Sequence, residues 1–235
     1  ILNRVWTDRP PVPLNKVEIH PLEYAGESVA EKLCRIRTEM RRAGASCILV
    51  TQLDDIAWIL NLRGTDVHCT PVFVAWLIVG EESATLYIKE EKLTPDVVDY
   101  LHAEGVAIDE YDNIIAALND CAAPTMLVDP STVNSTLAQP RGNYTVVSAP
   151  SPIPTMKAGK NHTEREGFRR AMERDGVAMV QFLKWLEEAV PKGSETELTA
   201  SAKLYHLRAE QPKFRDISFD TIAAYTDHAA IVHYE

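Results

Sequence analysis

The apolar positions in the first 150 residues change period from one segment to the next, as alternating strands and amphipathic helices require. Short apolar runs that predict strands lie at 47–51, 71–80, 84–89, 106–111, 125–129 and near 144–148. Helical patterns begin at Ser28 and recur at 53–62, 95–104, 112–121 and near 131–138. The second and third strands are separated only by "EES", which predicts an antiparallel hairpin. Strands that alternate with helices around one hairpin predict an α/β domain with a mixed sheet.

The first helix carries start and stop signals at both ends. Ser28 and Glu31 form an S-x-x-E capping box, and Gly44 fits the position just past the last turn. Between them, apolar residues recur at helical spacing and predict one buried face: Val29, Leu33, Ile36 and Met40. The preceding residues 1–27 hold four prolines and little periodicity, so we expect an extended lead-in.

The pattern changes at "SAPSPIPTMKAGK" (148–160), where three prolines among small residues indicate a linker. Beyond it, 162–190 predicts one long amphipathic helix that ends at Pro191, and a second helix follows at about 195–210. Strands are predicted at 220–224 and 229–234. Two helices and two strands do not close a core. We therefore expect a domain at 1–150, a linker at 151–160, and at 161–235 the first part of a larger domain.

Composition narrows the classes of function. Of 235 residues, 46% are hydrophobic and 25% charged, as in an ordinary soluble globular protein. The formal charge of 24 − 34 = −10 gives no electrostatic reason to bind nucleic acid or an anionic membrane. No apolar run approaches the roughly 20 residues that span a bilayer. The four cysteines lie far apart, which favours reduced, cytosolic thiols over disulfides or a zinc site.

Candidate chemistry is sparse by pattern alone. The sequence has no H-E-x-x-H, G-x-G-x-x-G, Walker A or G-x-S-x-G motif. Asp54 and Asp55 are adjacent, and capping of the following helix explains them better than a catalytic pair. Arg63 in "NLRGTD" fits either a solvated turn opened by Gly64 or a site for a carboxylate. His233 shares a predicted strand face with Ile231, so it is either a core imidazole or a group that titrates near neutral pH for catalysis.

Four stretches resemble one known family in the right order. They are "VWTDRPPVP" (5–13), "DDIAWILNLRGTDVHCTPVF" (54–73), residues 160–203 with the "VPKG" break, and "FRDISFDTIAAYTDHAAIVHY" (214–234). Together they are similar to cytosolic aminopeptidase P, an Xaa-Pro aminopeptidase family related to creatinase and prolidase. The likeness covers essentially the whole chain, which is more specific than any one segment.

The resemblance implies a creatinase-like α/β middle domain at 1–150 and the start of a pita-bread metallopeptidase domain at 161–235. Members of this family remove the first residue from peptides with proline second, and they use two divalent metal ions, usually manganese. The implied ligands are two aspartates, a histidine and two glutamates that follow the family's His-Tyr pair. They would lie beyond Glu235, so we expect this chain alone to be inactive and to bind no metal tightly. The resemblance also implies a cytoplasmic, homodimeric parent enzyme.

The resemblance gives His233 a role as the active-site histidine that contacts substrate. In the implied reaction a metal-bridging water attacks the carbonyl before proline, and an imidazole donor stabilises the oxyanion that forms. The turn before it departs from the family pattern G-x-N-x-A, because Thr226 stands at the glycine and His228 at the asparagine. A threonine restricts positive φ at that position. Arg63 matches a family arginine to which we assign no role.

Two other classes of function stay open from the sequence. The chain fits a non-catalytic α/β module for binding or dimerisation, and a prolidase-like dipeptidase on the same fold. The long spacing and the "VPKG" segment favour the aminopeptidase. The apolar side of helix 162–190 also predicts self-association when the rest of its domain does not cover it.

Overall fold

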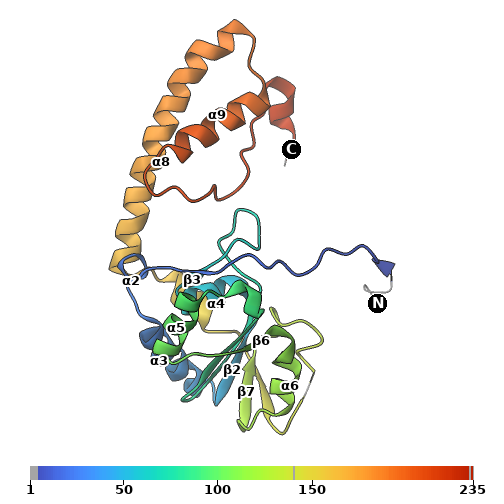
Figure 1. The fold of residues 1–235 in the computed structure, drawn as a ribbon. Coiled ribbons are helices and arrows are strands. Elements are labelled where there is room, and N and C mark those ends of the chain that lie inside the picture. The colour runs from blue at the N-terminus through green and yellow to red at the C-terminus, as the bar shows by residue number, and fades with distance from the viewer. Residues whose placement is uncertain (1–4, 140, 233, 235) are drawn as a thin grey trace. The chain divides into compact units, whose positions relative to one another are not determined.

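A computed structural model describes residues 5–139, 141–232 and 234 (Figure 1). The chain divides into two compact units, which we call unit 1 (Ile1–Asn161) and unit 2 (His162–Glu235).

Unit 1 is built on a six-stranded sheet. Its strands, in the order in which they lie side by side, are β6 (Ala107–Glu110), β5 (Ala84–Ile88), β4 (Trp76–Gly80), β2 (Cys47–Val50), β7 (Thr125–Val128) and β8 (Thr145–Ser148). β4 is antiparallel to both of its neighbours, whereas the pairs β5–β6, β2–β7 and β7–β8 are parallel. The sheet is therefore mixed, as the sequence predicts.

Helices cover both faces of this sheet. The helices of unit 1 are α2 (Leu22–Ala25), α3 (Val29–Arg42), α4 (Leu53–Ile59), α5 (Pro95–Ala103), α6 (Ile114–Asn119) and α7 (Ile153–Ala158), with 3-10 turns η1 (Glu90–Lys92) and η2 (Tyr111–Asn113). α3, α4, α5 and α7 contribute to the larger core with one face of the sheet, and α6 to a smaller core with the other face. Because β2 is covered on both sides, all four of its residues are buried.

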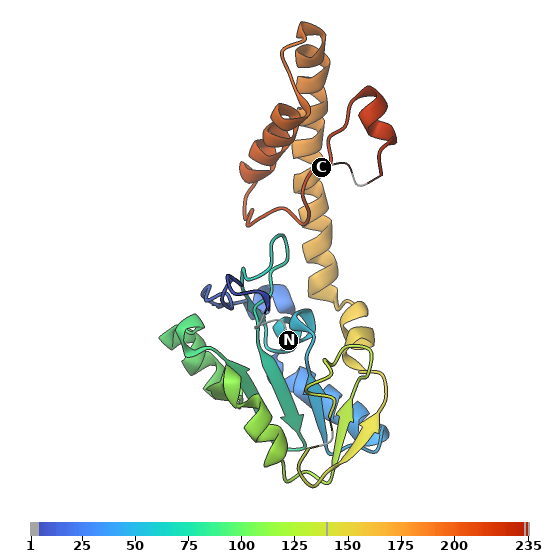
Figure 2. The ribbon, with the colours of Figure 1, turned by 90° about the vertical axis from the view of Figure 1, so that its right-hand side faces the viewer.

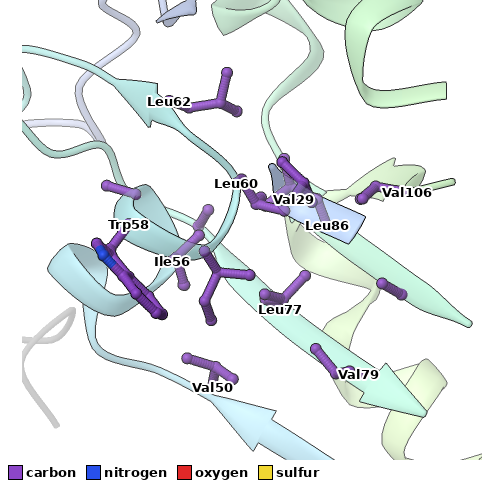
Figure 3. Close-up of a cluster of buried hydrophobic side chains, with 14 of the residues drawn as sticks. Val29, Val50, Ile56, Trp58, Leu60, Leu62, Leu77, Val79, Leu86 and Val106 are labelled. Atoms are coloured by element: carbon purple, nitrogen blue, oxygen red, sulfur yellow. The ribbon is translucent and has the colours of Figure 1, made fainter. Parts of the chain in front are cut away.

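The two cores follow the alternation of the strands. Ile48 and Val50 point into the larger core, whereas Cys47 and Leu49 between them point into the smaller one. Figure 3 shows part of the larger core, where side chains from α3, α4 and strands β2, β4 and β5 gather: Val29, Val50, Ile56, Trp58, Leu77, Val79 and Leu86.

The capping box and the terminal glycine predicted for α3 are confirmed. The Ser28 side chain accepts from the Glu31 amide, and Glu31 accepts from the Ser28 amide, so the capping box is complete. Gly44 follows the helix with φ of +77°, and the four predicted core positions are buried. This φ explains why glycine ends the helix, since other residues rarely adopt it.

Other segments of unit 1 differ from prediction. The lead-in is not wholly extended, because α2 lies within it, and its β1 (Glu18–Ile19) pairs with β3 (Leu62–Arg63). The helix predicted near 131–138 is absent, and turns occupy its place in these described residues. The segment predicted as a linker, 151–160, contains α7, and Ile153 is buried in the larger core. Pro152 and Pro154 sit at the N-cap and in the first turn of α7, where a missing N–H costs no helical hydrogen bond.

Unit 2 consists mainly of two packed helices, α8 (His162–Ala189) and α9 (Glu197–Ala209), which lie side by side in Figures 1 and 2. A 3-10 turn, η3 (Val190–Lys192), follows α8 and contains Pro191. Arg208 of α9 donates to both carboxylate oxygens of Asp175 of α8, at 2.7 and 3.3 Å. This bidentate ion pair fixes α9 against the middle of α8.

The strands predicted at the end of the chain do not form in the described residues. Residues 220–225 have no regular structure, and Thr226–Ala230 form a 3-10 turn, η4. A strand needs a partner for its backbone groups, and unit 2 offers none to this segment among the described residues. The strand predicted at 229–234 is therefore absent from 229–232, which belong to η4 and a turn after it, and His233 itself lies outside the described residues.

Candidate functional site

The candidate site of unit 2 is the turn before residue 233 together with Glu197, the first residue of α9. Glu197 Oε1 accepts from the backbone N–H of Tyr225 at 2.7 Å and lies 3.0 Å from His228 Nδ1. Glu197 Oε2 accepts from the Tyr234 hydroxyl at 2.8 Å. The rings of His228 and Tyr234 stack with their centroids 4.8 Å apart. One carboxylate therefore binds three groups that lie 28 to 37 residues further along the chain.

The turn held by Glu197 contains a threonine in the left-handed region. Thr226 has φ of +53°, a conformation that is costly for a β-branched residue. The family pattern has glycine here, so the backbone keeps a geometry that suits glycine although the side chain does not. The predicted restriction at position 226 is therefore present as local backbone strain.

The charges around Glu197 favour its ionised form. The hydrogen bond from Tyr234 holds the pKa of Glu197 below its usual value, and His228 and the Tyr225 amide act in the same direction. The same hydrogen bond raises the pKa of Tyr234, since the carboxylate disfavours a phenolate beside it. At neutral pH the arrangement is a carboxylate with a neutral phenol as donor.

The other residues singled out in the sequence lie in unit 1. Arg63 is partly buried, and its Nη1 donates to the carbonyl oxygens of Ala57 and Leu62 at 3.1 and 2.8 Å. The interpretation as a solvated turn is therefore wrong, because these bonds tie Arg63 to the end of α4. Gly64 next to it does not have positive φ. A Cβ there would lie 2.8 Å from the Phe73 Cβ, so glycine is needed for close packing.

Asp54 and Asp55 do not cap α4, which begins without a side-chain cap after Gln52. Both carboxylates instead pair with Lys157 of α7, whose Nζ lies 2.6 Å from Asp55 Oδ1. Asp55 is only 2% exposed, and burial raises its pKa against the opposing effect of Lys157. The two aspartates therefore join α4 to α7 and are not a catalytic pair.

The residues around Glu197 do not fit the dimetal centre implied by the resemblance. Both oxygens of Glu197 already accept hydrogen bonds, and the groups that they contact are an amide, an imidazole and a phenol. A dimetal site needs several fixed oxygen and nitrogen ligands around each ion. We therefore derive no chemical step through a metal at this position.

Glu197 is the residue that sequence reasoning missed. It stands one position after Thr196, which caps α9 together with Thr199, and an acidic residue in the first turn of a helix is common. Its contacts with 225–234 depend on the fold of the turn, and no sequence spacing reveals them.

Comparison with known families assigns both parts of the chain. Residues 8–164 match the Creatinase/Prolidase N-terminal domain, and residues 166–235 match metallopeptidase family M24. The chain therefore belongs to the creatinase/prolidase family, and the sequence-based resemblance is confirmed.

The curated proteins to which the chain is similar include aminopeptidases P. The chain is 35% identical to aminopeptidase P2 of Arabidopsis thaliana, over 100% of this chain and 38% of that protein. It is 36% identical to the probable Xaa-Pro aminopeptidase P of Aspergillus clavatus, again over 100% of this chain and 38% of that protein. The chain thus spans about two fifths of the length of these relatives.

Solved structures agree on the fold. The crystal structure of X-prolyl aminopeptidase from Caenorhabditis elegans, a cytosolic enzyme with a di-nuclear active site, matches with a TM-score of 0.91 and 31% identity, covering 100% of this chain and 40% of that one. The Xaa-Pro dipeptidase from Bacillus anthracis matches with a TM-score of 0.59 at 13% identity, covering 78% of this chain and 49% of that one. The second likeness concerns the fold alone. Among the described residues, no helix combines the length and apolar character of a transmembrane segment.

Proposed function

We propose that this chain is part of a dimetal Xaa-Pro aminopeptidase that removes the first residue from peptides with proline in second position. The observation that carries the proposal is the match of the whole chain, in both of its family segments, to aminopeptidases P. We propose that the parent enzyme is cytoplasmic and homodimeric, with 1–150 as its middle domain, 151–160, which contains α7, as the connecting segment packed on that domain, and 161–235 as the first part of its catalytic domain.

In this proposal His233 is the substrate-contacting histidine. Its imidazole donates a hydrogen bond to the reacting peptide, which develops negative charge on its carbonyl oxygen. Residues outside this chain would hold the two metal ions, manganese in our proposal, which would supply an activated water when bound. The chain itself contributes the histidine and the elements that support it.

The test uses the full-length enzyme with a tripeptide that has proline second and a matched tripeptide with alanine second. We expect manganese-dependent release of the first residue from the proline peptide only. His233→Ala should lower kcat/KM by at least about 100-fold, in the range for loss of an acid–base or donor group. His206→Ala, at an exposed position of α9, is the matched control and should keep the activity.

Other results would favour another function. Preferential cleavage of a dipeptide would identify a prolidase-like dipeptidase. If neither peptide is hydrolysed, the result would favour a non-catalytic module for binding or dimerisation. For the 235-residue chain by itself we expect no turnover and no tight binding of Mn²⁺ in calorimetric titration. Manganese-dependent turnover by this chain would contradict the proposal that the metal ligands lie elsewhere.

A further inference from the structure

The segment around residue 233 is held on both sides by a single carboxylate. Upstream, Glu197 accepts from the Tyr225 amide and contacts the His228 ring; downstream, it accepts from the Tyr234 hydroxyl. The stacking of His228 on Tyr234 brings the two ends of this segment together. Residue 233 thus lies in sequence between two anchored neighbours.

The segment has little else to hold it. Tyr225, Ile231 and Val232 expose most of their surface, and the described residues 225–232 include no buried side chain. Thr226 keeps a positive φ that its β-branched side chain disfavours. Contacts from outside the turn must therefore oppose its relaxation, and Glu197 makes two of them, with Tyr225 and His228.

We propose that Glu197 is a positioning residue of the aminopeptidase: its carboxylate holds the turn 225–230 and the Tyr234 hydroxyl, and thereby constrains the chain on both sides of position 233. This inference rests on the role proposed for His233. In this proposal Glu197 acts on the reaction through the neighbours of residue 233 that it holds, and not by contact with the substrate.

The test compares variants of the full-length enzyme in steady-state kinetics with the Xaa-Pro tripeptide. Glu197→Ala should lower kcat at least tenfold with a smaller change in KM, because an orienting contact is lost while most substrate contacts remain. Glu197→Gln, which keeps the size and one acceptor oxygen, should recover part of kcat. Tyr234→Phe removes one hydroxyl and provides a milder variant if Glu197→Ala does not fold. Glu187→Ala, at an exposed position of α8, is the matched control.

A double-mutant cycle separates positioning from general stability. In a His233→Ala background, Glu197→Ala should cost no further activity, since the residue it orients is already missing. Thr226→Gly should recover part of the loss in Glu197→Ala by removing the strain. Independent losses in the double variant His233→Ala/Glu197→Ala, or unchanged kcat in Glu197→Ala, would overturn the proposal.

Hydrogen–deuterium exchange gives a readout that does not depend on activity. In the same preparations, peptides that cover 225–234 should exchange faster in Glu197→Ala than in the unmodified enzyme, while peptides from α3 and β2 should not change. If the enzyme proves inactive on Xaa-Pro peptides, the proposed function fails, yet the exchange result still decides whether Glu197 holds this segment. Unchanged exchange in 225–234 would refute the anchoring.

Discussion

Lys32 carries a positive charge inside the larger core of unit 1, where only 1% of its surface is exposed. Its Nζ donates to the carbonyl oxygen of Trp58 at 2.7 Å and to Asn61 Oδ1 at 2.6 Å, and it lies 4.5 Å from the centre of the Trp58 ring. Asn61 has φ of +49° and donates through Nδ2 to the Glu27 carbonyl. Through these hydrogen bonds Lys32 holds the turn between α4 and β3 in place.

We expect Lys32→Met to lower the free energy of unfolding by about 2–3 kcal/mol, because methionine keeps the apolar stem but leaves two buried acceptors without their charged donor. Chemical denaturation of the 235-residue chain measures this change. Arg41→Met, at an exposed position of the same helix, is the control and should change it by less than about 0.5 kcal/mol. A Lys32→Met variant as stable as the parent chain would show that these bonds contribute nothing net.

His20 gives unit 1 a dependence on pH. Its pKa is lowered from 6.5 to about 4, first by burial and then by the positive charges of Arg63 and Lys32. Between these two values the unfolded chain binds a proton that the folded chain does not. The free energy of unfolding should therefore fall as the pH decreases from about 6.5 toward 4.

Denaturation at several pH values between 7 and 4.5 tests this effect. The slope should be smaller in His20→Gln than in the parent chain, because glutamine does not titrate. His102→Gln, at an exposed position of α5, should keep the full slope. Identical slopes in His20→Gln and the parent would exclude His20 as the source.

At the residue scale, local chemistry was predictable and partners distant in sequence were not. Ser28 and Glu31 interact over three residues, so their pattern reveals the capping box. Glu197 meets Tyr234 across 37 residues, and Asp55 meets Lys157 across 102, and nothing in the spacing of these residues indicates a contact. The positive φ of Thr226 was not foreseen, since the loss of a glycine at this position predicts a restriction on positive φ.

At the scale of elements, α7, the last helix of unit 1, packs against α4. Lys157 on α7 pairs with the buried Asp55 and with the half-exposed Asp54. Ile153 on the same helix is fully buried in the larger core. This short helix is thus held by Ile153, by the partly buried Met156 and by the two ion pairs of Lys157.

We expect Lys157→Met to destabilise unit 1 by about 2 kcal/mol, since it leaves the Asp55 carboxylate buried without its cation. Asp55→Asn in the same background should restore part of the loss by removing the charge. Asp54→Asn alone should have an effect below about 0.5 kcal/mol, because that carboxylate is 57% exposed. Thermal and denaturant unfolding measure all three, and an Asp54→Asn effect larger than that of Lys157→Met would contradict this ranking.

The elements of unit 1 were largely predictable because each strand or helix carries its own period. The strands at 47–50, 84–88 and 125–128 match the predicted runs closely. α7 was missed because two prolines resemble a linker, although both occupy the first positions of the helix. The strands predicted in unit 2 fail for a different reason. A strand forms only beside another, and the segment 220–225 has no such neighbour in the described part of the chain.

At the scale of the whole molecule, the two units differ in how much apolar surface they bury. Both core clusters consist of residues from unit 1. Among the described residues of unit 2 the buried apolar side chains are Ala178, Ala189, Leu204 and Leu207. By contrast, large apolar side chains on α8 are exposed: Phe168, Met172, Val177, Val180 and Leu183.

We therefore expect the 235-residue chain to self-associate through α8 as its concentration rises, because an uncovered apolar face of this extent favours contact with another copy. Sedimentation velocity over a range of concentrations measures this association. Replacing Met172 and Val180 by glutamate should shift the chain toward the monomer, while Glu187→Gln should not. A monomer at every concentration before any replacement would contradict the expectation.

The order of strands in the sheet also determines when each strand can meet its partners while the ribosome synthesises the chain. β2 receives its antiparallel partner β4 once residue 80 has been made, but its parallel partner β7 ends only at residue 128. The difference of 128 − 80 = 48 residues corresponds to roughly 2–10 s of translation at about 5–20 residues per second. During that interval the backbone groups on one side of β2 have no sheet partner. The nascent chain then still exposes one unpaired edge of β2 to chaperones, and slower translation through this stretch would prolong that exposure.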